Sequence, residues 1–240
     1  MVAVNGLAGG TAIIGGKNTA EISDAYPTLV TPAGYVFSIW GIIYTLLGVF
    51  VFYQALASQR GKEFHQKIGW FFALSCAVNI VWLFLWQYVY LGFSVILMLI
   101  LLGSLIMIYL RLDINRNNSL IREKLAVQLP FSVYLGWITI ATIANISVAL
   151  VASNWNGFGV SPETWAMAII IVALIIAVAV TWTRKDVAYS VVITWALVGI
   201  SVNQEGVAFI ASLTKTSALI VAVAALVVLI LNIRRKQAHN

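Results

Sequence analysis

The stretch TPAGYVFSIWGIIY (residues 31–44) joins a Thr-Pro-Ala-Gly turn directly to the start of an apolar helix. Pro32 suits the first turn of a helix, because its missing N–H would have no intrahelical partner there. Phe37, Trp40 and Tyr44 follow at spacings of three and four residues, which places the three rings on one helix face. That face is either an aromatic wall turned toward a ligand or a packing surface between membrane helices. The spacing alone favours packing.

The composition of the whole chain indicates a membrane protein. Of its 240 residues, 62% are hydrophobic and 9% are charged, whereas a soluble domain carries about 25% charged residues. Continuous runs of Leu, Ile, Val and Ala reach the roughly 20 residues that a helix needs to cross a bilayer. A transmembrane β-barrel would instead need short alternating strands. We therefore predict an all-α integral membrane protein embedded in a lipid bilayer.

Apolar runs predict seven membrane helices after a shorter apolar segment at the start of the chain. Residues 1–14 would extend only about 21 Å as a helix, which predicts a short or truncated first helix. The longer helices are expected at about residues 33–55, 67–88, 91–111, 125–152, 163–183, 187–204 and 215–233.

The basic residues predict how these helices are oriented. Twelve of the 14 Lys and Arg residues lie on alternate loops and at the C-terminus, and only Lys17 and Lys215 lie on the other side. Because basic loops stay in the cytoplasm, eight crossings place both termini inside and the loop 15–31 outside the cell membrane. The net charge of +6 is then a topology signal, so no nucleic-acid partner is expected.

Two further helices carry aromatic and amide side chains on a single face. Positions three, four or seven residues apart lie on the same side of a helix, and the residues at such spacings are Asn79, Trp82, Trp86, Tyr134, Trp137, Ala141 and Asn145. An amide in an apolar core needs hydrogen-bond partners. Asn79 and Asn145 are therefore expected to face protein or a cavity and not lipid. Whether they contact a ligand or only bridge helices is open at this point.

The nine tryptophans differ in their expected depth. Tryptophans near helix ends are typical of the aromatic belts that mark a membrane interface, and this group comprises Trp70, Trp155, Trp165 and Trp182. Trp40, Trp137 and Trp195 lie well inside their helices, where a belt does not explain them. Trp82 and Trp86 fit either interpretation.

The sequence offers little for catalysis or ion coupling. The first five predicted helices contain no Asp, Glu, Lys, Arg or His in their membrane core, and ion-coupled transporters usually keep such residues there. Cys76 is the single cysteine, so the chain supplies neither an intrachain disulfide nor a cysteine cluster for a metal. We therefore expect a protein that is not an enzyme and that carries no cofactor.

Three motifs resemble the TspO/MBR family of tryptophan-rich sensory proteins, whose mitochondrial relative is the translocator protein. The family pattern is W-x-P-P-G-x-x-F-x-x-x-W-x-x-x-Y, then L-N-x-x-W, then Y-L-A-W-x-x-x-A-T-x-x-N. This chain has TPAGYVFSIWGIIY at 31–44, VNIVW at 78–82 and YLGWITIATIAN at 134–145. The resemblance covers residues 1–153. It predicts a five-helix core there and an appended three-helix module at 154–240, which has no counterpart in the five-helix family core.

The chain also departs from the family pattern around the first loop. Val30 stands where the family has a loop tryptophan, and Ala33 replaces the second proline. Trp86 and Gln87 replace a Phe-Phe pair, and Val133 replaces a proline. These departures predict that the turn before residue 34, and with it the ligand preference, differs from that of relatives.

The resemblance implies a cavity near the first loop that binds a tetrapyrrole such as protoporphyrin IX or haem, or another hydrophobic small molecule such as a sterol. It also implies a stress-related sensor, regulator or carrier, and for some members a homodimer. The residues that match pocket or near-pocket positions, together with two neighbouring tryptophans, are Trp40, Trp137, Asn79, Phe37, Tyr44, Trp82, Trp86, Tyr134, Ala141 and Asn145. Two alternatives stay open: a membrane transporter of porphyrins or other amphipathic solutes, and a porphyrin-degrading enzyme centred on Trp40 and Trp137.

Overall fold

The computed structural model describes residues 1, 5–6, 14–117 and 119–237. Within these ranges the chain forms helices and no β-strand, so the predicted all-α membrane fold is confirmed. Most of the segment 1–14, predicted as a short first helix, lies outside the described residues. The helices are α2 (Thr19–Asp24), η1 (Gly34–Ser38), α3 (Ile39–Ala55), η2 (Ala57–Gln59), α4 (Glu63–Ile68), α5 (Phe71–Gln87), α6 (Leu91–Arg111), α7 (Ile121–Glu123), η3 (Lys124–Gln128), α8 (Leu129–Ala152), η4 (Gly157–Gly159), α9 (Pro162–Arg184), α10 (Val187–Asn203) and α11 (Ala208–Gln237).

The lengths of these helices fit a bilayer. In the part of the chain that the structure describes, five segments are long and apolar enough to cross a membrane: 34–55, 91–111, 121–152, 162–184 and 208–234. The two further apolar helices, α5 and α10, have 17 residues each. At 1.5 Å per residue they extend about 25 Å, a little less than the roughly 30 Å hydrocarbon core.

Two predicted helix starts were wrong, and each has a local cause. Gly69 has a φ of +54°, which no α-helix accommodates. α4 therefore ends at Ile68, and α5 begins at Phe71 and not at residue 67. α11 begins at Ala208 and not at 215. The polar Thr214 fits inside this helix, where its hydroxyl donates to the carbonyl of Ile210 at 2.8 Å. Lys215, expected at a helix start, is therefore an exposed residue two turns inside α11.

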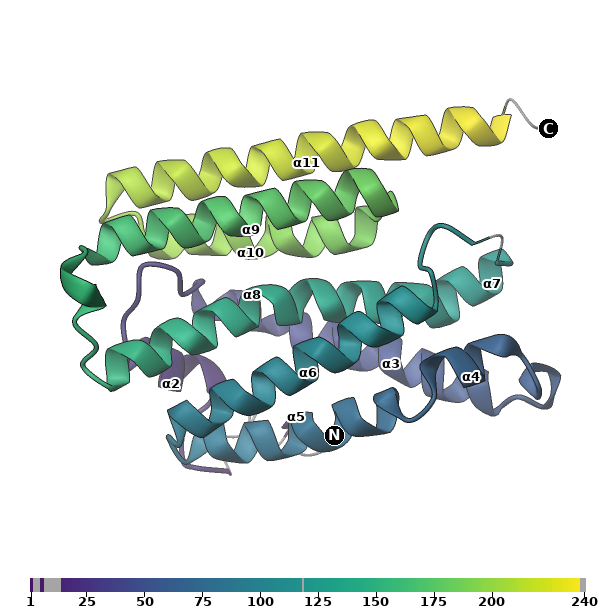
Figure 1. Ribbon diagram of the computed structural model, residues 1–240, viewed down its shortest axis with the longest axis horizontal. Helices are drawn as coiled ribbons and strands as arrows, with labels where there is room; N and C mark the ends of the chain where they lie inside the picture. Colours follow the sequence, from purple (N-terminus) through teal and green to yellow (C-terminus); the bar gives the residue numbers. More distant parts are fainter. Residues whose placement is uncertain (2–4, 7–13, 118, 238–240) are drawn as a thin grey trace.

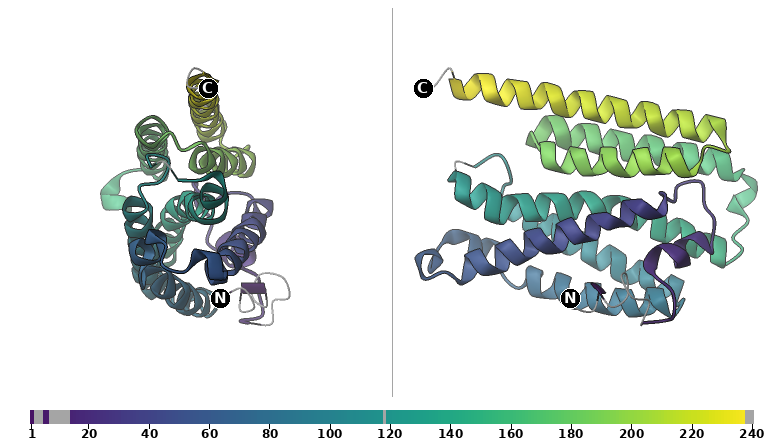
Figure 2. Two further views of the ribbon diagram at one scale, coloured as in Figure 1. Left: turned by 90° about the vertical axis from the view of Figure 1, so that its right-hand side faces the viewer. Right: turned by 180° about the vertical axis from the view of Figure 1, so that it is seen from behind.

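The helices form two layers that meet along α8 and α10. Figures 1 and 2 show α9, α10 and α11 together in one layer, with α3, α5, α6 and α8 in the other. The layers approach closely at Gly136 of α8, where an added Cβ would lie 3.1 Å from Val192 and 3.2 Å from the carbonyl of Tyr189. Buried residues from both layers form one hydrophobic cluster, so α9, α10 and α11 share their core with the preceding helices.

A buried carboxylate also joins the layers, at the connection between α9 and α10. Asp186 is 1% exposed, and its Oδ2 accepts hydrogen bonds from the Tyr109 hydroxyl at 2.8 Å and the Ser132 hydroxyl at 2.5 Å. Its Oδ1 accepts from the backbone N–H of Tyr189 at 3.1 Å and caps α10. The sequence analysis missed this buried carboxylate. Asp186 follows Arg184 and Lys185, and three charged residues in succession are typical of a solvated loop.

The basic loops gather at one end of the molecule. The connections around α4 and α7 lie at the same end as the last turn of α11 (Figure 1). α2 and the loop between α8 and α9 lie at the opposite end. This arrangement agrees with the alternation of charges in the sequence, and the orientation of the ends relative to the cytoplasm stays a prediction.

Candidate ligand-binding site

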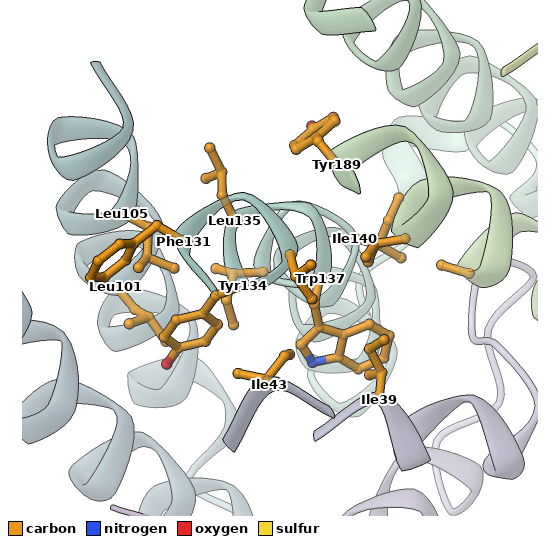
Figure 3. Packing of buried hydrophobic residues seen from close by; sticks show 14 of the residues in the cluster. Ile39, Ile43, Leu101, Leu105, Phe131, Tyr134, Leu135, Trp137, Ile140 and Tyr189 are labelled. Carbon is orange, nitrogen blue, oxygen red and sulfur yellow. The ribbon is translucent and has the colours of Figure 1, made fainter. Parts of the chain in front are cut away.

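An aromatic cluster forms where α3, α5 and α8 meet. Trp40 lies at its centre, with its ring stacked on Tyr44 at 5.4 Å and 6.1 Å from each of Trp82, Tyr134 and Trp137. Figure 3 shows Tyr134 and Trp137 extending from α8 toward α3, with Tyr189 of α10 on the other side of α8. The predicted aromatic faces of the three helices therefore do face one another.

The cluster borders a small cavity. Seven of the residues predicted from the sequence line this cavity: Phe37, Trp40, Trp82, Trp86, Trp137, Ala141 and Asn145. The other lining residues are Thr19, Ser23, Pro32, Ile140 and Ala144. The cavity volume is about 20 Å³, which is close to the space that one water molecule needs. Tyr44 and Tyr134 touch the rings but do not line the cavity, and Asn79 also lies outside it.

The two predicted amides are buried and hydrogen-bonded. Asn145 is 2% exposed, and its Oδ1 accepts a hydrogen bond from the Trp82 indole at 2.8 Å while its Nδ2 donates to Ser94 at 2.9 Å. The Oδ1 of Asn79 accepts from the amide of Asn5 at 2.8 Å. Asn145 thus bridges α5, α6 and α8 and also borders the cavity, whereas Asn79 joins α5 to the start of the chain.

Two polar atoms in the cluster are buried without a partner. The indole Nε1 of Trp137 and the hydroxyl of Tyr44 have no hydrogen bond within the described part of the chain. Trp137 is 1% exposed, so its N–H cannot be satisfied by bulk water. An unmade buried hydrogen bond costs about 1–3 kcal/mol, and an acceptor on a molecule entering the cavity would remove that cost.

The short helix α2 closes the cavity at its outer side. Thr19 and Ser23 of α2 are buried cavity residues, and the indole of Trp86 donates to the carbonyl of Thr19 at 3.2 Å. α2 itself is held by a capping box, in which Asn18 accepts from the backbone of Glu21 and Glu21 accepts from that of Asn18 at 2.7 Å. Within the described part of the chain, this six-residue element therefore covers the aromatic rings on this side through Thr19 and Ser23.

A much larger cavity lies on the other side of α2. It has a volume of about 840 Å³ and is formed by the segment 23–31, the end of α8, the loop to α9, the start of α9 and the end of α10. Trp155 and Trp165, which we interpreted as interfacial belt residues, are half-buried in its wall. The belt interpretation fits Trp70 and Trp182 better, because they are 65% and 42% exposed.

A family model described as TSPO-like protein matches residues 1–233. The chain belongs to the TSPO-like family. The resemblance to the TspO/MBR proteins is thereby confirmed, and the match extends over α9, α10 and most of α11. No curated protein and no solved structure matches the chain. Within the described ranges of this TSPO-like protein, no group of three His, Cys, Asp or Glu side chains comes together to hold a metal ion.

The first turn of this TSPO-like protein is fixed to α10. The N–H of Ala33 donates to the carbonyl of Gly199 at 3.0 Å, and the side-chain amides of Asn203 and Gln204 donate to the carbonyls of Thr31 and Thr28 at 3.1 and 3.0 Å.

Val30, at the position of the family's loop tryptophan, is 4% exposed. It packs with Ala166, Ile170 and Ile210 of α9 and α11. The departures at Val30 and Ala33 therefore coincide with the contact between this turn and the last three helices.

Proposed function

We propose that this TSPO-like membrane protein binds a tetrapyrrole, or a similar planar hydrophobic molecule, at the aromatic cluster. In this proposal it serves as a stress-related sensor, regulator or carrier. The observation that supports the proposal most is the convergence of seven sequence-predicted residues from η1, α3, α5 and α8 on one cavity. Flat indole rings stack favourably on a planar macrocycle. Ligand sites of this kind are mostly apolar, with a few polar groups that fix the orientation.

The polar groups of the cluster suit a ligand that carries an acceptor. The Trp137 N–H is buried and unpartnered among the described residues, so it is free to donate to a carboxylate or carbonyl oxygen. Asn145 already accepts from Trp82, and this bond fixes the orientation of the Trp82 ring. The stacking surfaces are then Trp40 and Trp82, whose ring centres lie 6.1 Å apart at an interplanar angle of 33°.

Binding requires the cluster to open. Pockets for drug-sized ligands have volumes of about 300–1,000 Å³, and the aromatic cavity has about 20 Å³. Displacement of α2 would enlarge the aromatic cavity, because Ser23 of α2 lines both this cavity and the cavity of about 840 Å³, which we call the outer cavity. With α2 moved, the two spaces would join. We therefore expect ligand binding to be coupled to a movement of α2.

The test is a titration of the purified protein with protoporphyrin IX, followed by the quenching of tryptophan fluorescence. We expect saturable quenching. Trp40→Phe combined with Trp137→Phe should weaken binding roughly tenfold, because the smaller phenyl rings lose part of the stacking surface and the ligand loses the Trp137 N–H as a donor.

The matched control is Trp70→Phe combined with Trp182→Phe, which removes two indoles that are 65% and 42% exposed. The control should bind like the unaltered protein. Equal affinities for the two double variants, with both folded by circular dichroism, would contradict the assignment of the site.

A further inference from the structure

The outer cavity is a separate binding space with its own chemistry. Its volume of about 840 Å³ falls within the range of pockets that hold drug-sized ligands. Among its described lining residues, Ser23 alone is shared with the aromatic cavity. Most of its wall is apolar, with Leu29, Val30, Leu150 and Ile169 among the lining side chains. It is large enough for a ligand without any movement of α2.

Asp24 gives this cavity a negative charge. Among the described residues that line it, Asp24 is the only one with a charged side chain, and it takes part in none of the salt bridges within the described chain. Partial burial, and to a smaller extent the nearby Glu21 carboxylate, raise the pKa of Asp24 above its ordinary value. Both effects act against the charged form, and a bound cation would offset both.

The surroundings of the cavity are acidic as well. The end of the molecule that contains α2 carries four carboxylates, Glu21, Asp24, Glu163 and Glu205, against the two lysines Lys17 and Lys215. A surface of one sign concentrates molecules of the opposite charge near a cleft. This end therefore attracts cations, in contrast to the basic end around α4 and α7.

Two indole rings supply the aromatic part of the wall. Trp155 and Trp165 lie 5.3 Å apart at an interplanar angle of 54°, and both border the cavity. The Trp165 N–H donates to the carbonyl of Gly157 at 3.0 Å, which fixes the ring and uses its one donor. What these rings still offer a ligand is their faces, and the face of tryptophan is the best aromatic surface for a cation.

From this combination we propose that the outer cavity binds a hydrophobic monocation, such as a protonated alkylamine that carries an aromatic group, or a quaternary ammonium or phosphonium ion. The positive centre lies between the Asp24 carboxylate and the indole faces of Trp155 and Trp165, and the apolar body lies against the aliphatic wall. An anion of the same shape is repelled by Asp24. This site therefore selects a charge opposite to that of a tetrapyrrole dicarboxylate, and it is independent of the aromatic cluster.

A pair of ions with nearly the same shape tests this inference. Tetraphenylphosphonium carries one positive charge, and tetraphenylborate is its negative counterpart. We expect purified protein to bind radiolabelled tetraphenylphosphonium saturably and at least about tenfold more tightly than tetraphenylborate, because Asp24 attracts the first and repels the second. Asp24→Asn keeps the shape of the side chain and removes its charge, and it should weaken phosphonium binding roughly fivefold, as expected for a partly exposed ion pair.

The control is Glu163→Gln, which removes an exposed carboxylate at the same end that does not line the cavity. It should leave phosphonium binding unchanged. Equal affinity for the two ions, or an unchanged affinity in a folded Asp24→Asn protein, overturns the inference. The Trp40→Phe/Trp137→Phe protein should bind tetraphenylphosphonium normally, so failure of the tetrapyrrole proposal is distinguishable from failure of this one.

Discussion

Replacing Gly199 by alanine should break the contact between the first turn and α10. A Cβ at this position would lie 2.1 Å from Cγ2 of Val36 and 3.4 Å from Cβ of Pro32. Val36 is completely buried, and as a β-branched residue it has few rotamers with which to move away. Overpacking of this kind costs about 1–3 kcal/mol, while the gain in helix propensity from glycine to alanine is at most about 1 kcal/mol. We expect a net loss of about 1–2 kcal/mol.

The measurement is thermal unfolding in detergent micelles, followed by tryptophan emission. Gly103→Ala in α6 is the matched control, because an added Cβ there meets no atom within 4 Å. The control should be as stable as the unaltered protein or slightly more stable. At roughly 2–4 °C per kcal/mol for a chain of this size, Gly199→Ala should unfold several degrees earlier.

A double variant separates this steric effect from other causes. Val36→Ala removes the Cγ2 atom that meets the new Cβ, so in that background Gly199→Ala should cost nothing further. The coupling between the two substitutions should then be at least about 1 kcal/mol. If Gly199→Ala and Gly103→Ala unfold at the same temperature, or if Val36→Ala gives no rescue, the close approach of the turn to α10 is not as described.

Two further results are expected. Asp186→Asn should lower the unfolding temperature by the equivalent of about 1–3 kcal/mol, because the neutral amide is a weaker acceptor for the hydroxyls of Tyr109 and Ser132. Asp113→Asn should cost less, because Asp113 forms a half-exposed salt bridge with Arg184. Tetraphenylphosphonium binding should be full well above the pKa of Asp24 and weaken as the pH falls through it, beginning at higher pH than for a solvated aspartate because that pKa is raised by burial and Glu21. Asp24→Asn should remove this pH dependence, measured as affinity at a series of pH values.

The helices were predictable because a membrane constrains them so strongly. An apolar run of about 20 residues has few alternatives to a spanning helix, and the expected bounds of α6, 91–111, agree with the structure. The start of α11 was predicted wrongly because composition alone does not determine where this helix begins. Thr214 and Lys215 have the composition of a loop. The hydroxyl of Thr214, however, donates to a carbonyl of the helix itself, and this bond cannot be predicted from composition.

The aromatic cluster was also within reach of the sequence, because its residues repeat along helices. Trp82 and Trp86 of α5 and Trp137 and Ala141 of α8 each lie one turn apart, and both pairs line the same cavity. The outer cavity was not within reach. Asp24 and Trp155 come from segments about 130 residues apart, and their proximity results from how the two layers pack. A rule based on depth alone assigned Trp155 to the membrane interface.

The bonds of the first turn limit which part of the molecule can open. The segment from residue 28 to residue 33 is tied to α10 by three hydrogen bonds, and Val30 is buried against α9 and α11. Moving this segment would break all of these contacts, whereas α2 is held by the bond from Trp86 to Thr19 and by the burial of Ile22 in the hydrophobic core. Since α2 has fewer hydrogen bonds to the rest of the described chain than this segment has to α10, we expect α2 to move first. Because the last three helices hold the turn in place, we expect a ligand that reaches the aromatic cluster from this end to displace α2 and leave the turn unmoved.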